Sequence, residues 1–95
     1  MVIETVDYTI KSGSEAEFER IFAILQKVFK TVPGCVKTRL FRDTKETSTF
    51  LLFMQWESQE ALEAMRKDAG FDEWRLKSRE LAGGPSKPRF YTETL

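Results

Sequence analysis

The chain reads Thr49-Phe50-Leu51-Leu52-Phe53-Met54-Gln55-Trp56 at its most apolar point. In a β-strand, successive side chains point to opposite faces of the sheet. The even-numbered residues 50–56 are all apolar and share one face, while Leu51 and Phe53 share the other. We therefore predict a strand over residues 49–56 that needs cover on both of its faces.

Three further segments alternate as strands do, over residues 2–10, 35–42 and 89–95. The first of these places apolar side chains on one face, with Glu4 as the exception among them. The polar residues 43–48 are predicted to form the hairpin connection into the strand at 49–56.

Two other segments carry apolar residues at helical spacing. The first is predicted to begin at Ser14, in a capping box with Glu17, and to end at Pro33-Gly34. The second is predicted to begin at Ser58, with an interruption at Asp68-Ala69-Gly70 before it continues towards the last strand.

This order, β-α-β-β-α-β, is that of the ferredoxin-like fold, an α+β fold with a four-stranded antiparallel sheet and its helices on one face. Residues 1–95 are predicted to form a single domain, because this length leaves no room for a second core. The uncovered face would then carry Leu51, Phe53 and Phe41, and a patch of large apolar side chains usually marks an interface. We expect a homodimer in which two sheets pack face to face.

The charge balance and hydropathy exclude several classes of partner. The 15 Lys and Arg residues balance 15 Asp and Glu, so the chain lacks the net positive charge that favours nucleic acids and anionic membranes. The longest apolar run, residues 50–54, is far shorter than the roughly 20 residues of a transmembrane helix. We expect no nucleic-acid partner, no membrane association and a cytoplasmic location.

The chain contains no histidine and one cysteine, Cys35. These counts exclude an intramolecular disulfide, a Ser-His or Cys-His nucleophile pair, an ordinary zinc site and a histidine ligand for haem. The chain also lacks a Gly-rich phosphate loop of the kind that binds flavin or nicotinamide dinucleotides. We therefore expect neither a metal nor an organic cofactor.

Short motifs spread over nearly the whole chain resemble the antibiotic biosynthesis monooxygenase family, whose members are dimeric α+β barrels. The motifs are Gly13-Ser14 with Glu17-Phe18-Glu19, Pro33-Gly34-Cys35, Gln55-Trp56-Glu57-Ser58 before Glu60-Ala61-Leu62, Phe71, and Gly84-Pro85 before Lys87 and Arg89. The resemblance implies oxidation of small electron-rich aromatic compounds, of the anthrone or quinol type, by O₂ without a cofactor. The alternative is a non-catalytic, dimeric small-molecule binding or stress-response protein of the same fold.

Haem degradation, another activity found among relatives of this family, is disfavoured by one position. The haem-degrading relatives carry an iron-ligating histidine on the helical segment that follows the strand tryptophan. A gapless alignment places Arg75 at that position, and no residue within one helical turn of it is histidine.

Three residues are candidates for catalysis. The resemblance places Trp56 in the pocket, where its indole would stack on a planar substrate; the alternative is a core tryptophan. Glu4 would be a usable base if burial raised its pKa, whereas a position near a sheet edge would leave it solvated or paired with an arginine. Arg75 could hold a phenolate or quinone oxygen, with an ordinary surface arginine as the alternative.

Four aromatic residues are candidates for substrate binding, and the alternative for each is plain core packing. They are Tyr8, Phe22, Phe71 and Trp74. Asp7 would replace Glu4 as the candidate base only if the first strand were shifted by one residue, because parity decides which side chains face the helices.

Overall fold

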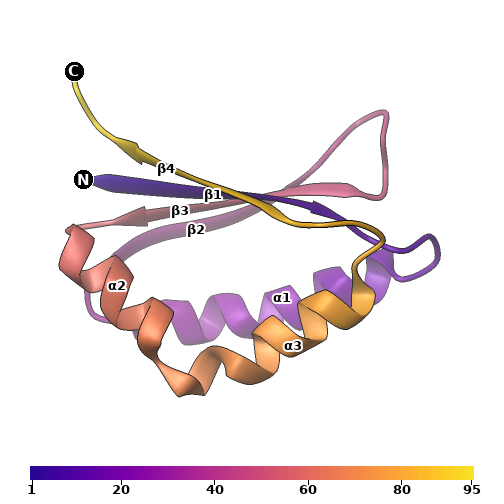
Figure 1. The fold of residues 1–95 in the computed structure, drawn as a ribbon, viewed down its shortest axis with the longest axis horizontal. Coiled ribbons are helices and arrows are strands. Elements are labelled where there is room, and N and C mark those ends of the chain that lie inside the picture. The colour runs from indigo at the N-terminus through magenta and orange to yellow at the C-terminus, as the bar shows by residue number, and fades with distance from the viewer.

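Strands and helices follow the predicted order β-α-β-β-α-β in a computed structural model that describes residues 1–95 (Figure 1). The second helical region consists of two α-helices joined by a 3₁₀ turn at Ala69–Phe71. The elements are β1 (Val2–Thr9), α1 (Glu15–Phe29), β2 (Cys35–Arg42), β3 (Thr49–Trp56), α2 (Gln59–Lys67), α3 (Asp72–Leu81) and β4 (Lys87–Thr92).

The four strands form one antiparallel sheet in the order β2-β3-β1-β4, which confirms the ferredoxin-like α+β fold. β1 is therefore an inner strand, and β4 lies beside it at one edge. The bounds of β2 and β3 are those predicted from the sequence. β4 differs, because it begins two residues earlier and ends at Thr92, which pairs with Val2 at the start of β1. Beyond Thr92, one further backbone bond joins the two ends, from the Glu93 N–H to the Met1 carbonyl at 3.3 Å.

All three α-helices cover the same face of the sheet (Figure 1). α2 begins as predicted, because the Ser58 hydroxyl accepts a hydrogen bond from the Ala61 N–H at 3.1 Å. The capping box predicted at Ser14 is wrong, since that side chain makes no capping bond. The carboxylate of the next residue, Glu15, stabilises the turn before α1 instead. It accepts hydrogen bonds from the Gly13 N–H at 2.7 Å and from the Ser48 hydroxyl at 2.6 Å.

The core lies between this face of the sheet and the helices. β3 contributes four consecutive inward side chains, none more than 4% exposed: Phe50, Leu52, Met54 and Trp56. α1 packs against them through one buried stripe: Phe18, Phe22, Leu25 and Phe29. The strand that decides the fold is therefore covered completely on its helical face.

The opposite face of the sheet carries no helix (Figure 1). Leu51 and Phe53 of β3 are only partly buried there, and Phe41 of β2 is 51% exposed. Tyr91 of the edge strand β4 is 47% exposed. This face of the sheet, which we call the open face, therefore keeps several large apolar side chains without cover within a single chain.

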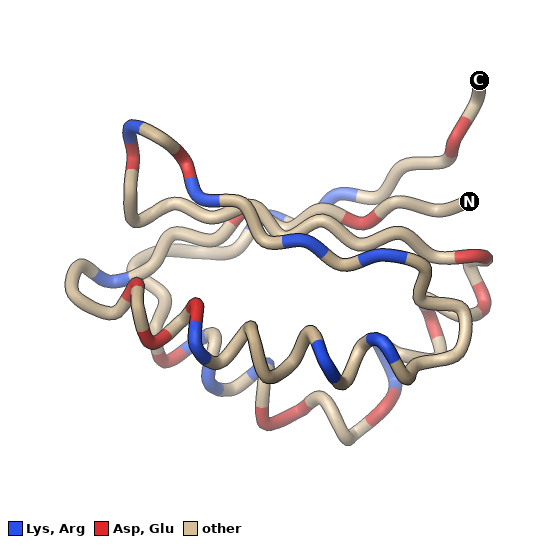
Figure 2. Tube along the Cα trace, turned by 180° about the vertical axis from the view of Figure 1, so that it is seen from behind, with Lys and Arg blue, Asp and Glu red and all other residues tan.

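Charged residues are distributed over the whole molecule. Figure 2 shows basic and acidic positions interspersed on the helices as well as on the strands. None of the helices is both long enough and apolar enough to cross a lipid bilayer.

Candidate functional site

A cavity of about 300 Å³ lies between the helical face of the sheet and the segment that runs from α2 to α3. β1 and β3 form its floor, and the end of α2, the 3₁₀ turn and the start of α3 form its roof. Its volume is at the lower end of the range for ligand-binding cavities. The polar and aromatic side chains that line it are Glu4, Tyr8, Phe29, Arg66, Phe71, Trp74 and Arg75.

Glu4 is the buried acid of this cavity. Its side chain faces the helices from the inner strand β1 and is 8% exposed, so the predicted alternative of a solvated position near a sheet edge does not apply. Its Oε1 atom has no hydrogen-bond partner, and no salt bridge is formed by this carboxylate. Asp7 points to the opposite face and lies outside the cavity.

Burial raises the pKa of the Glu4 carboxyl above its ordinary value of 4.5, because desolvation disfavours the charged form. The positive charge of Arg66, the Trp56 indole N–H and the charge of Arg75 act in the opposite direction. Desolvation is the largest of these effects. The same burial, together with the Glu4 charge, raises the pKa of the Tyr8 hydroxyl.

Trp56 lies in the core, next to the cavity. It is 0% exposed, is absent from the cavity wall, and packs edge-on against Phe29 with ring centroids 6.5 Å apart. Its indole Nε1 is close enough to lower the pKa of Glu4, yet the two groups form no hydrogen bond of ordinary geometry. Trp56 can therefore influence the Glu4 carboxyl from within the core, but it cannot stack on a ligand in the cavity. Other aromatic rings provide the stacking surface of the cavity.

Those rings are Phe29 of α1 together with Tyr8, Phe71 and Trp74, which are three of the four aromatic candidates named from the sequence. Phe71 stacks on Phe29 with a centroid distance of 5.0 Å and an interplanar angle of 9°. Phe22 is 3% exposed and does not line the cavity. It supports the wall from behind, with its ring 6.0 Å from that of Trp74 in an edge-to-face arrangement.

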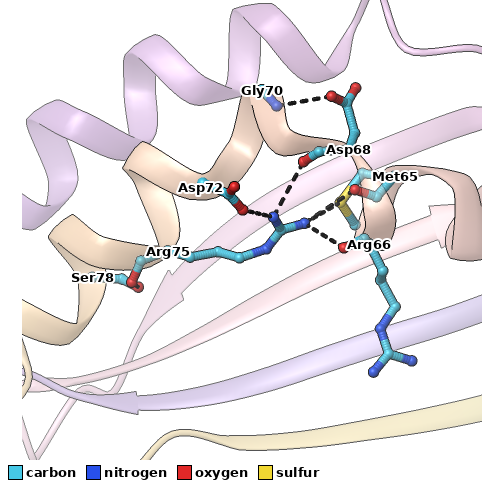
Figure 3. A network of polar contacts seen from close by, with 7 residues as sticks. All are labelled: Met65, Arg66, Asp68, Gly70, Asp72, Arg75 and Ser78. Atoms are coloured by element: carbon cyan, nitrogen blue, oxygen red, sulfur yellow. Dashed lines mark hydrogen bonds and ion pairs between the residues drawn. The ribbon is translucent and has the colours of Figure 1, made fainter.

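Arg75 also lines the cavity, but its guanidinium is held by the end of α2 (Figure 3). Its Nη2 donates to the carbonyls of Met65 at 3.1 Å and Arg66 at 3.0 Å. Its Nη1 donates to the Asp68 carbonyl at 3.2 Å and to the Asp72 carboxylate at 2.8 Å. The carbonyls of Met65 and Asp68 also accept the backbone N–H groups of Asp68 and Phe71, so Arg75 adds a second donor to each of them and joins α2 to α3.

A second hollow, of about 360 Å³, lies between α1 and α3. Apolar side chains such as Ile24 and Val28 line it, and Arg20 and Glu73 are among its charged residues. It contains neither of the two buried side-chain atoms that lack a hydrogen-bond partner. The Glu4 cavity is therefore the candidate site.

The sequence profile of the antibiotic biosynthesis monooxygenase family matches residues 1–76. The chain belongs to this family. It is 30% identical over 76 residues to YczJ, an uncharacterized protein of Bacillus subtilis (strain 168), and the match covers 79% of the chain and 80% of YczJ. It is 27% identical over 90 residues to sll1783, an uncharacterized protein of Synechocystis sp. (strain ATCC 27184 / PCC 6803 / Kazusa), and this match spans 90% of the chain but only 61% of that protein.

The fold is shared with SnoaB, a cofactor-independent oxygenase from Streptomyces nogalater. The structures superpose with a TM-score of 0.89 and 24% sequence identity, over 99% of this chain and 93% of SnoaB. All of the cavity residues named above lie within residues 1–76, the part of the chain that matches the antibiotic biosynthesis monooxygenase family. Strand β4 lies after this part.

Sequence reasoning missed Arg66, Met65 and Phe29 as cavity residues in this family member. Met65 and Phe29 belong to apolar helical stripes, which read as core. Arg66 lies in the last turn of α2, where a cation is favoured by the helix dipole whatever its other contacts. Glu4 is the only acidic residue that lines the cavity. Nowhere in the molecule do three or more His, Cys, Asp or Glu side chains lie close enough together to hold a metal ion.

Proposed function

We propose that this chain is a cofactor-independent monooxygenase that oxidises small electron-rich aromatic compounds, of the anthrone or quinol type, with O₂. The observation that carries the proposal is the Glu4 carboxylate, which is buried in an aromatic-lined cavity with one oxygen unpaired. An unpaired buried polar group costs free energy, and titratable groups in such surroundings are concentrated at functional sites. The similarity to SnoaB, a cofactor-independent oxygenase, supports the same class of reaction.

The reaction needs a base and an apolar cavity. An anthrone-type substrate carries a CH₂ group, and Glu4 would remove one of its protons to give a carbanion stabilised by the flanking rings. The carbanion passes one electron to O₂, and the two radicals combine into a peroxide that takes the proton back from Glu4. Loss of the remaining C–H proton and cleavage of the O–O bond then leave a carbonyl group and release water. In balance, CH₂ and O₂ become C=O and H₂O, with O₂ as the oxidant.

The other candidate residues would support this step. Tyr8, Phe71 and Trp74 provide flat apolar walls that exclude water and orient the rings of the substrate. Trp56 directs its indole N–H towards the region of Glu4 and favours the ionised form of the base. Arg75 contributes a fixed positive charge that stabilises the substrate anion, while Phe22 holds Trp74 in place.

Oxygen uptake tests the proposal directly. The purified chain should consume O₂ with at least one member of a panel of anthrones, quinols and catechols, monitored with an oxygen electrode and by product spectra. Glu4→Gln should lower turnover by roughly 10²- to 10⁴-fold, the usual contribution of a positioned general base. Asp7→Asn is the matched control, because it removes a carboxylate from the same strand on the opposite face of the sheet.

Two results would reject the proposal in different ways. Undiminished turnover in Glu4→Gln would eliminate the carboxylate as the base. Thermal stabilisation by the same compounds, with no oxygen uptake from any of them, would instead favour the non-catalytic small-molecule binding protein.

A further inference from the structure

Arg66 is the one cation at the cavity whose hydrogen-bond donors are free. It lies in the last turn of α2, lines the cavity, and its guanidinium makes no hydrogen bond and no salt bridge to another side chain. Figure 3 shows its side chain leaving α2 towards the strands, whereas Arg75 turns back to the end of α2. The two arginines therefore differ in what they offer a ligand.

The guanidinium of Arg66 is held in place by an aromatic ring. Its Cζ atom lies 5.0 Å from the centroid of the Phe90 ring, in a cation–π contact. Phe90 pairs with Glu4 across β1 and β4 and shares its face of the sheet. The guanidinium therefore lies over Phe90, the cross-strand neighbour of the candidate base, at the edge of the sheet formed by β4.

The contact with the ring uses none of the N–H donors of the guanidinium. This group carries five such donors in a fork that matches two oxygens of a carboxylate. Arg66 and Phe90 are both exposed to solvent, whereas Glu4 is buried. The cavity therefore has a cationic, solvent-facing end and an acid at its inner end.

We propose that Arg66 is a specificity-determining residue, and that the ligand is a planar hydroxylated aromatic compound carrying a carboxylate, which Arg66 binds at the solvent-facing end of the cavity. The inference rests on the proposed use of the cavity for aromatic substrates. The carboxylate pairs with Arg66, and the rings extend inward between Phe71 and Trp74 towards Glu4. The oxidised position of the substrate then lies on the ring system away from the carboxylate.

The electrostatics of the cavity agree with this orientation. Arg66 is the strongest of the charges that lower the pKa of Glu4. A bound carboxylate neutralises Arg66 and weakens that effect, which leaves Glu4 a stronger base when the cavity is occupied. A ligand carboxylate placed in the cavity without Arg66 as its partner would meet the Glu4 charge uncompensated, which like-charge repulsion opposes.

Calorimetric titration without turnover tests the inference. The probes are 3-hydroxy-2-naphthoate and 2-naphthol, which share two fused rings and one hydroxyl group and differ by the carboxylate. Wild type should bind the naphthoate about 10- to 100-fold more tightly, as expected for a charge-assisted pair. Arg66→Gln should abolish this preference and leave naphthol binding unchanged, and Arg66→Lys, which keeps the charge without the fork, should retain part of it.

Lys67→Gln is the matched control, because it removes the same charge from the adjacent position of α2 without touching the cavity. Its preference for the naphthoate should equal that of wild type. Equal affinity of wild type for both probes, an unchanged preference in Arg66→Gln, or the same loss in Lys67→Gln would each overturn the inference. Circular dichroism of the three variants establishes that they are folded.

The proposed oxygenase activity can fail separately. A naphthoate preference that depends on Arg66, without oxygen uptake from any aromatic compound of the panel, charged or uncharged, would uphold the anion site and reject the oxygenase. Oxygen uptake that is equally fast with uncharged substrates and in Arg66→Gln would uphold the oxygenase and reject the anion site.

Discussion

At Glu4, the loss of solvation and the nearby positive charges shift the pKa of the carboxyl in opposite directions. Desolvation raises the pKa of its carboxyl, and the surrounding cations and the Trp56 N–H only partly offset that effect. In the folded chain the carboxyl therefore holds its proton more tightly than it does in the unfolded chain. The ionised form that acts as a base is thus obtained at a cost in stability.

That cost predicts how Glu4→Gln changes stability with pH. Protonated Glu4 stabilises the fold fully below its unfolded pKa of about 4.5, and this contribution is lost as the pH rises through the higher folded pKa. Glutamine stays neutral throughout, so the variant should gain in melting temperature relative to wild type from pH 4.5 upward and reach a plateau above the folded pKa. Calorimetry between pH 4 and pH 8 measures the difference. A variant that becomes less stable than wild type at pH 8 would show that the carboxylate is paired instead.

Sequence reasoning located some site residues and not others. Strand parity alone placed Glu4 on the helical face, because a period of two leaves only two choices. Nothing local distinguished Arg66 from any other arginine of a helix end, since its partner Phe90 is 24 positions away and meets it only through the fold. Arg75 has one local partner, Asp72, three positions before it, but its bonds to the carbonyls of Met65 and Arg66 depend on how α3 folds back on the end of α2.

At the scale of single elements, two serines that look alike in sequence have different roles. Ser58 accepts the Ala61 N–H at the start of α2, whereas Ser14 at the start of α1 makes no side-chain capping bond. Ser58→Ala should lower the free energy of unfolding by about 0.5–2 kcal/mol, the usual value of an N-cap. Ser14→Ala should change it by only a few tenths of a kcal/mol, and urea unfolding of both variants measures the contrast. Equal losses in the two variants would contradict it.

The bounds of the elements were predictable where local signals agreed. β2 and β3 alternate, and a polar connection separates them, so their predicted residues match the structure. The connection is closed by Asp43, whose carboxylate accepts the N–H groups of Lys45 and Glu46. The observed bounds of β4 differ from the predicted ones because β4 extends only as far as its partner β1 allows. This pairing joins the two ends of the chain. Long-range pairing is the part that local patterns do not contain.

At the scale of the whole molecule, the two faces of the sheet are unequal. The helices bury the inward side chains of β3 completely, although Phe90 of β4 on the same face is 43% exposed. The open face retains partly exposed Leu51 and Phe53 on β3, with exposed Phe41 on β2 and Tyr91 on β4. Several exposed large apolar side chains on one face of a small protein usually mark an interface. Those of the open face come from β2, β3 and β4 and so extend across the width of the sheet, which suits contact with a second sheet.

We predict that two chains associate through the open faces, because an isologous contact would cover both apolar surfaces at once. Light scattering at micromolar concentration should return twice the mass of one chain, with an interface that buries more than about 1,000 Å² in total. Phe53→Glu places a charge at the centre of that contact and should give a monomer. Leu76→Glu is the matched control, because Leu76 is 55% exposed on α3, on the helical side of the molecule, and the variant should remain a dimer. A monomeric wild type, or a Phe53→Glu dimer, would mean that the apolar side chains of the open face are not what holds two chains together.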